Sequence, residues 1–273
     1  MNIIPHVVKA LSNKTDVYQG AEPFPHIVIE NFLPKDVVSR IIKDFPKPES
    51  DIWRQRIEDV YQVKLASNNV DAAPECIRST MYQLNSSSVL KAMENLTGEG
   101  PLISDPYYDG GGLHQIQRGG YLAVHSDFTR PTHLPIYRRL NLLIYLNPDW
   151  EASYGGNLEL WSRDGKSKVR EVSPVLNRAV IFTTDTTSFH GHPEPLQCPP
   201  DRCRRSLALY YYSVEAPGRL HTGTQTRWRL DAGGNQRGLR ARGAAFLWRL
   251  SRKLGNMASE WEGPLGPESE ERR

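Results

Sequence analysis

A histidine and an aspartate lie two positions apart, as His125 and Asp127, in the largely apolar stretch YLAVHSDF of residues 121–128. Alternate side chains of a β-strand point to the same face, so an imidazole nitrogen and a carboxylate oxygen converge there. These groups supply two ligands of a three-point metal site, and the third is expected on a later strand. His190, after the stretch AVIFTTDTTSF, is the leading candidate, and His192 is the alternative.

Two histidines and one carboxylate on one face of an octahedral ion leave three positions open, as in non-haem Fe(II) oxygenases. Taken alone, a His-x-Asp pair is weak evidence, because such pairs often occur by chance on protein surfaces. The stretch RCRRSLALYYYS adds evidence, since Arg204 and Ser206 also share a strand face. A guanidinium holds a carboxylate through two parallel hydrogen bonds. These residues predict a dicarboxylic co-substrate that binds the metal at one end and Arg204 at the other.

The elements that must position these residues change in character along the chain. Helical periodicity occurs in segments 34–45 and 89–96, and a short strand is expected at 26–29. From about residue 113 the period becomes two, in segments rich in branched and aromatic residues: LHQIQ, YLAVHSDF, LNLLIYLN, GNLELW, AVIFTT and RSLALYYYS. Short strands without intervening helices favour a double-sheet or barrel architecture, with helices supplied by the N-terminal third.

In this order, the stretches resemble the 2-oxoglutarate- and Fe(II)-dependent dioxygenases, specifically the prolyl-4-hydroxylase-like branch. The resemblance covers about residues 113–213 and lies in five motifs: GGYLAVHSDF, RRLNLLIYLNPDW, YGGNLELW, NRAVIFTTDTTSFHGH and RRSLALYYYS. It implies an α+β, mainly β fold, namely a double-stranded β-helix (distorted jelly roll) flanked by N-terminal helices.

The resemblance implies an iron centre in this domain. His125, Asp127 and His190 match the iron ligands of the family. His190 is preferred over His192 because it lies five residues beyond Asp185, the spacing that the family shows. Because Asp127 is retained, whereas related halogenases carry a small residue there, hydroxylation is the expected reaction. No catalytic residue beyond the metal centre is predicted.

The resemblance also implies a 2-oxoglutarate site. Arg204, with Ser206 beside it, matches the arginine that binds the distal carboxylate, and Tyr145 matches a tyrosine that hydrogen-bonds the same group. Gln117 lies where many members carry a tyrosine, and an amide there can still donate to a carboxylate. Asn141 shares a strand face with Tyr145 and is expected to project inward. Ascorbate is a further expected reductant.

The implied reaction is hydroxylation of an unactivated C–H bond, with release of succinate and CO₂. The expected substrate is a polar small molecule or a saccharide, which is lipid-linked if the chain meets a membrane; the alternative is a prolyl residue of a peptide or protein. A different class of function is a catalytically silent jelly-roll protein that only binds a ligand. In the loop 127–139, Arg130, His133 and Arg138 are candidate substrate contacts, although solvated loop charges are the simpler interpretation.

The C-terminal part of the chain differs in composition. Residues 1–220 are predicted to form a single dioxygenase domain, and residues 221–273 an extension with a disordered end. Within it, 237–257 combines six Arg and Lys residues with an apolar face and has no acidic residue, which predicts a basic amphipathic helix. This helix either packs on the jelly roll or makes a peripheral contact with anionic lipid.

Composition excludes several other classes. A net charge of +3 over 273 residues is not that of a dedicated nucleic-acid binder. No apolar run approaches the roughly 20 residues that cross a bilayer, and the N-terminus lacks the features of a signal peptide. The three cysteines, Cys76, Cys198 and Cys203, form no Cys-x-x-Cys pair. A reducing cytoplasm is therefore the expected location.

Overall fold

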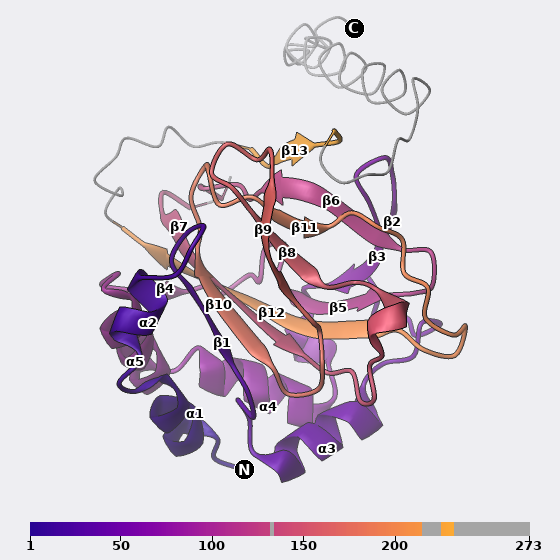
Figure 1. Cartoon of the computed structure of the whole chain (residues 1–273). Coiled ribbons are helices and arrows are strands. Elements are labelled where there is room, and N and C mark those ends of the chain that lie inside the picture. Colours follow the sequence, from indigo (N-terminus) through magenta and orange to yellow (C-terminus); the bar gives the residue numbers. More distant parts are fainter. Residues whose placement is uncertain (132–133, 215–224, 232–273) are drawn as a thin grey trace, which may run out of the picture. The chain divides into compact units, whose positions relative to one another are not determined.

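The strands pair antiparallel into one sheet that curls into a nearly closed barrel (Figure 1). The computed structural model describes residues 1–131, 134–214 and 225–231. In these ranges the strands are β1 (His26–Ile29), β2 (Gln55–Glu58), β3 (Gln62–Ser67), β4 (Ile103–Ser104), β5 (Gly112–Ile116), β6 (Tyr121–Ser126), β7 (Tyr137–Tyr145), β8 (Leu158–Trp161), β9 (Lys168–Val172), β10 (Ala179–Thr183), β11 (His190–His192), β12 (Arg204–Ser213) and β13 (Arg227–Arg229). Their order is β1-β10-β7-β12-β5-β3-β6-β11-β8-β9, while β4 pairs with β12, β2 with β3 and β13 with β6.

The helices come from the first hundred residues and gather against one side of the sheet (Figure 1). They are α1 (Ile4–Leu11), α2 (Thr15–Gln19), α3 (Lys35–Asp44), α4 (Glu75–Leu84) and α5 (Ser87–Thr97), with short 3₁₀ turns at Val70–Ala72 and Ala152–Tyr154. Helix α3 forms because apolar residues recur at helical spacing, and Val37, Val38 and Ile41 are buried against the sheet. Helices α3 and α5 confirm the two helical segments predicted from periodicity.

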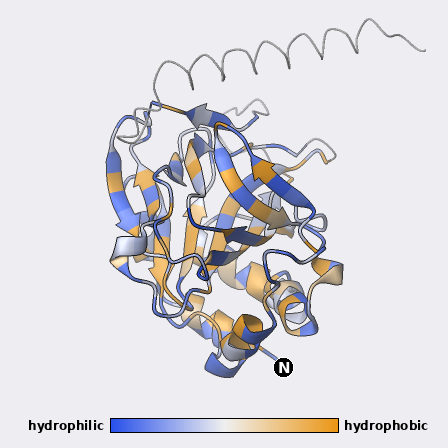
Figure 2. Cartoon of the chain, turned by 90° about the vertical axis from the view of Figure 1, so that its right-hand side faces the viewer, coloured by the Kyte–Doolittle hydropathy of each residue, from blue (hydrophilic) through white to orange (hydrophobic). Residues whose placement is uncertain are grey.

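Strands β7 and β12 divide the interior into an apolar face and a polar face. On one face, Leu142, Ile144, Leu207 and Leu209 join the apolar residues of α3, α4 and α5 in one core cluster. Each such buried side chain contributes about 1.5–3 kcal/mol to folding. The opposite face, which lines the barrel, carries the polar residues Asn141, Tyr145, Arg204 and Ser206. Figure 2 shows hydrophobic residues concentrated in the strands and the helices beneath them.

The mainly β fold with N-terminal helices is confirmed. Strands β1, β5, β6, β7, β8, β10 and β12 lie where the period-two segments predicted them. Strands β2, β3, β4, β9, β11 and β13 were not predicted, and β2, β3, β11 and β13 border the site described below. Residues Met1–Asn235 form one compact unit. The helix predicted at 237–257 lies outside the described residues.

No helix in the described ranges is both long enough and apolar enough to span a bilayer. The three cysteines are free thiols.

Candidate functional site

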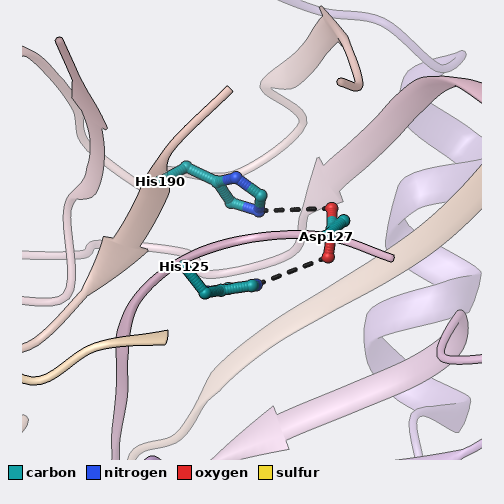
Figure 3. A group of neighbouring side chains, drawn as sticks. All are labelled: His125, Asp127 and His190. Carbon is teal, nitrogen blue, oxygen red and sulfur yellow. Dashed lines mark ion pairs between the residues drawn. The ribbon is translucent and has the colours of Figure 1, made fainter. Parts of the chain in front are cut away.

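His125, Asp127 and His190 meet inside the barrel, where all of their candidate ligand atoms lie within 4.8 Å of one another (Figure 3). Strands β6 and β11 are neighbours, and His190 lies directly opposite His125 in their register. Asp127 follows the end of β6 on the same face as His125. The Nε2 atoms of His125 and His190 lie 3.4 and 3.5 Å from the two carboxylate oxygens of Asp127. The predicted convergence of these residues is therefore present in the structure.

Both imidazoles are held in an orientation that suits a metal ligand. The Nδ1 atom of His125 lies 2.9 Å from the backbone oxygen of Ala123, and Nδ1 of His190 lies 3.0 Å from that of Ser188. A carbonyl only accepts, so Nδ1 carries the proton and the Nε2 lone pair faces Asp127. Burial lowers the pKa of His190 to about 4, partly offset by Asp127, which keeps this ring neutral at neutral pH.

The carboxylate of Asp127 is fixed by two side chains from β7. Its Oδ2 atom accepts hydrogen bonds from Arg138 Nη2 at 3.0 Å and from Asn141 Nδ2 at 2.8 Å. Burial by itself would raise the pKa of Asp127, but Arg138 and the two histidines outweigh it and hold the pKa well below its usual range. Asn141 thus projects inward as predicted, but it contacts the candidate metal ligand.

Arg138 is a buried part of this site, which corrects the interpretation that it is a solvated loop charge. The residue is 2% exposed, and its guanidinium carbon lies 3.3 Å from the ring centroid of Tyr210 and 4.8 Å from that of Phe128. Parity with Asn141 and Tyr145 would place Arg138 on the other strand face. The pairing of β7 with β12 is irregular between Leu140 and Arg138, and this irregularity, which the sequence did not signal, brings Arg138 to the side of Asn141. Arg130 is exposed, and His133 lies outside the described residues.

His192 lies in the same cavity but not in the His/Asp/His group. In β11 it sits opposite Leu122, one step away from the pairing of His190 with His125. Both of its ring nitrogens are buried and have no hydrogen-bond partner among the described residues. Burial, with Arg204 and Lys64 nearby, lowers the pKa of His192 well below its ordinary value. The geometry therefore favours His190 as the third ligand.

Arg204 lies at the other end of the cavity and is 5% exposed. Its Nε donates to the backbone oxygen of Gly156 at 2.7 Å, and its Nη2 donates to the Tyr145 hydroxyl at 3.3 Å. Ser206 lies opposite Tyr145 in the register of β12 and β7. Gly156 has a φ of +74°, and a Cβ atom there would meet the Arg204 side chain at 3.0 Å. The Gly-Gly turn before β8 therefore makes room for the guanidinium.

The cavity that joins the His/Asp/His group to Arg204 is suited to bind an anion. Its volume is about 210 Å³, and its walls include the His/Asp/His group, Arg204 and Ser206. No carboxylate of the described residues forms an ion pair with Arg204. Burial without an acidic partner lowers the pKa of this guanidinium. A buried cation of this kind fits a ligand carboxylate, and two imidazoles with one carboxylate fit Fe(II).

Gln117 does not reach this cavity, which corrects its prediction as a co-substrate contact. It is exposed in the turn that links β5 to β6. His114 and Ile116 of β5 face the cavity, and side chains alternate along a strand, so position 117 falls on the face that points away from the cavity. His114 faces the cavity with Nε2 3.1 Å from the Gly110 backbone oxygen.

Trp228 borders the metal end and was missed in the sequence. Strand β13 places it directly opposite His125. Its ring centroid lies 4.8 Å from that of His125 and 4.8 Å from that of Tyr61, on which it stacks. The alternating stretch RWR was the available signal, but the residues before it gave no indication that the chain returns to β6.

The chain matches known proteins over most of its length. Residues 111–212 match the model of the 2OG-Fe(II) oxygenase superfamily. Prolyl 3-hydroxylase OGFOD1 of Xenopus laevis is 33% identical over 211 residues, which are 72% of this chain and 37% of that protein. The mouse protein of the same name is 24% identical over 196 residues, covering 70% of this chain and 33% of its own length. The chain thus spans about a third of the length of these relatives.

Solved structures agree in fold. A prolyl 4-hydroxylase of Phytophthora capsici superposes with a TM-score of 0.52 at 18% identity, covering 77% of this chain and 65% of that one. A prolyl-4-hydroxylase of Pseudomonas putida gives a TM-score of 0.52 at 15% identity, covering 77% of this chain and all of the other. Through residues 111–212, the chain belongs to the 2OG-Fe(II) oxygenase superfamily, whose cofactors are Fe(II) and 2-oxoglutarate, and it has the fold of the prolyl-4-hydroxylase-like branch.

Proposed function

We propose that this protein is an Fe(II)- and 2-oxoglutarate-dependent dioxygenase that hydroxylates a prolyl residue of a peptide or protein. The observation that carries the proposal is one cavity that joins the buried His125/Asp127/His190 group to the unpaired Arg204. The relatives support the substrate class, since the two matched proteins are named prolyl 3-hydroxylases.

A prolyl substrate replaces the saccharide expected from the sequence. The lipid-linked form of that saccharide depended on a membrane contact by 237–257, which lies outside the described residues. No matched relative reported above is named for a saccharide, so a lipid-linked sugar has no support. Location in the cytoplasm stays a prediction.

When bound, Fe(II) and 2-oxoglutarate supply the oxidation of a substrate C–H bond by dioxygen, with succinate and CO₂ as products. His125, Asp127 and His190 would hold the ion, and Arg204, Tyr145 and Ser206 would hold the distal carboxylate.

The surrounding residues of the chain orient these groups. Arg138 and Asn141 fix the Asp127 carboxylate through Oδ2. The ring of Phe182 lies 4.7 Å from that of His190, and Trp228 covers His125. These aromatic rings exclude water from the imidazoles and limit their rotation, which preserves the geometry of the site.

The test is a turnover screen on the full chain with Fe(II), 2-oxoglutarate and ascorbate. Prolyl peptides and free proline form one arm, and neutral and acidic saccharides form the other. We expect succinate release and a mass gain of one oxygen atom on a prolyl residue, with amino-acid analysis separating 3-hydroxyproline from 4-hydroxyproline. Hydroxylation only in the saccharide arm would contradict the proposal.

The same screen separates an enzyme from a silent binding protein. Without substrate, a dioxygenase of this family is expected to release some succinate from 2-oxoglutarate. No succinate from any arm, together with normal binding of Fe(II) and 2-oxoglutarate, would favour the binding protein.

A further inference from the structure

Lys64 projects into the cavity from β3, a strand that the sequence did not predict. The residues of β3 that line the cavity alternate, as Gln62, Lys64 and Ala66 do. The side chain of Lys64 is half-buried. No carboxylate of the described residues lies within ion-pair distance of its ammonium group.

The register places Lys64 and Arg204 in one row across three strands. Leu65 pairs with Gln115 and Ala66 with His114, so the same register sets Lys64 beside Ile116. Ile116 in turn pairs with Arg204. Neighbouring strands are about 4.8 Å apart, so the two Cα atoms are separated by roughly 10 Å across the sheet. Both side chains line the cavity on this face of the sheet.

The groups around Lys64 do not neutralise it. Its charged neighbours are Asp127, Asp59, Arg138 and Arg204. Asp127 already binds Arg138, while Asp59 Oδ1 accepts the backbone N–H groups of Tyr61 and Gln62.

Two histidines also face this end of the cavity. Burial lowers the pKa of His114 and that of His192 well below the ordinary value, and the positive charges of Lys64 and Arg204 lower both further. Both rings are therefore neutral. Among the described residues that line the cavity, Lys64 and Arg204 are the cations that remain for a ligand after Asp127 has paired with Arg138.

We propose that Lys64 is a second anion-binding residue of this cavity, and that 2-oxoglutarate is held between Lys64 and Arg204. This inference rests on the proposed function, because it requires a dicarboxylate that extends from the metal end toward Arg204. A dianion matches the two unpaired cations in charge. The planar guanidinium fixes one carboxylate, while the flexible ammonium acts as a point charge from two strands away.

Burial lowers the pKa of Lys64 to about 8, partly offset by Asp127 and Asp59. An anion beside the ammonium group favours its charged form and raises this pKa. Binding of 2-oxoglutarate is therefore accompanied by proton uptake at Lys64 above about pH 8. The neighbouring histidines stay neutral, and the arginines and Asp127 stay charged, so they contribute no proton there.

The test is calorimetric titration of 2-oxoglutarate into the full chain loaded with Mn(II), which binds without turnover. We compare the wild type with Lys64→Met, Lys64→Arg and the control Lys166→Met, which removes the same charge from an exposed site. Loss of one charge-assisted contact should weaken binding about tenfold or more in Lys64→Met. Lys64→Arg should stay within about threefold of the wild type, and Lys166→Met should equal it.

Repeating the titrations at pH 8.5 in buffers of different ionisation enthalpy measures the proton count. The wild type should take up a fraction of a proton on binding, and Lys64→Met should take up none. Thermal unfolding of each variant checks its fold. Equal affinity and equal proton uptake in the wild type and a folded Lys64→Met would overturn the role of Lys64. Absence of 2-oxoglutarate binding in the wild type would instead overturn the proposed function.

Discussion

The two ends of the cavity differ in how their charges are satisfied. At the metal end, Asp127 is surrounded by Arg138, Asn141 and two imidazoles before any ligand arrives. At the other end, Arg204 is buried, and in the described part of the chain its hydrogen bonds go to the Tyr145 hydroxyl and to the backbone oxygen of Gly156. The first end is pre-organised, whereas the second carries an uncompensated charge.

This difference implies different costs for changes at the two ends. A buried charge whose partner is removed costs several kcal/mol. A buried charge without an ion-pair partner already carries its desolvation cost, and an apolar replacement removes that cost. Changes at the metal end should therefore impair both stability and binding. Changes at the anion end should impair binding alone.

The largest expected effect is at the metal ligands. His125→Ala and Asp127→Ala should reduce substrate-dependent succinate formation to the assay background, because each removes one of three ligands. His192→Leu should retain Mn(II) affinity, since this residue lies outside the group. Wild-type turnover by either alanine variant, with iron supplied, would show that the ligand assignment is wrong.

At the anion end, Arg204→Met should weaken 2-oxoglutarate binding by about 30-fold or more, the equivalent of about 2 kcal/mol. Calorimetric titration with Mn(II) present measures this change. The unfolding midpoint of the ligand-free variant should equal or exceed that of the wild type, because the buried cation has no acidic partner. A lower midpoint would contradict the contrast between the two ends.

The next largest effect is expected at Arg138, which holds the Asp127 carboxylate in place. Arg138→Met should weaken Mn(II) binding about 10- to 100-fold, the usual effect of losing a residue that orients a metal ligand. It should also lower the unfolding midpoint, since a buried carboxylate loses its partner. Arg139→Met changes the adjacent residue of β7, which pairs with Glu99 away from the cavity, and serves as the control. Equal Mn(II) affinity in Arg138→Met and Arg139→Met would show that Arg138 does not support the metal site.

The smallest effect concerns pH. The pKa of His190 falls from 6.5 to about 4 on folding, so between these values the unfolded chain binds a proton that the folded chain excludes. Stability is therefore full above pH 6.5 and falls as the pH drops toward 4, by at most about 1.4 kcal/mol per pH unit from this residue. Urea unfolding of metal-free protein should show a shallower pH slope in His190→Gln. Identical pH slopes of stability in the wild type and His190→Gln would contradict the lowered pKa of His190.

The sequence predicted most of the barrel because inward and outward residues alternate in its strands. Strands β5, β6, β7, β8, β10 and β12 were found in this way, and the same parity placed Asn141 and Tyr145 inside. Parity also explains the error at Gln117, which lies beyond the end of β5 and on its other face. Strand β3 was not predicted, although Val63 and Leu65 alternate with the polar Gln62 and Lys64, because the run is short and lies in the part of the chain from which helices were expected.

By itself, the sequence determined the identity of the chemical groups: an imidazole and a carboxylate on one strand face, a later histidine, and an arginine beside a serine. Each depends on spacing within one strand, which the period of two fixes locally. Only the tertiary structure decided which strands are neighbours. It brought Arg138 to Asp127, Trp228 to His125 and Lys64 into one row with Arg204. Such contacts depend on strand pairing between distant segments, and spacing within a strand does not specify that pairing.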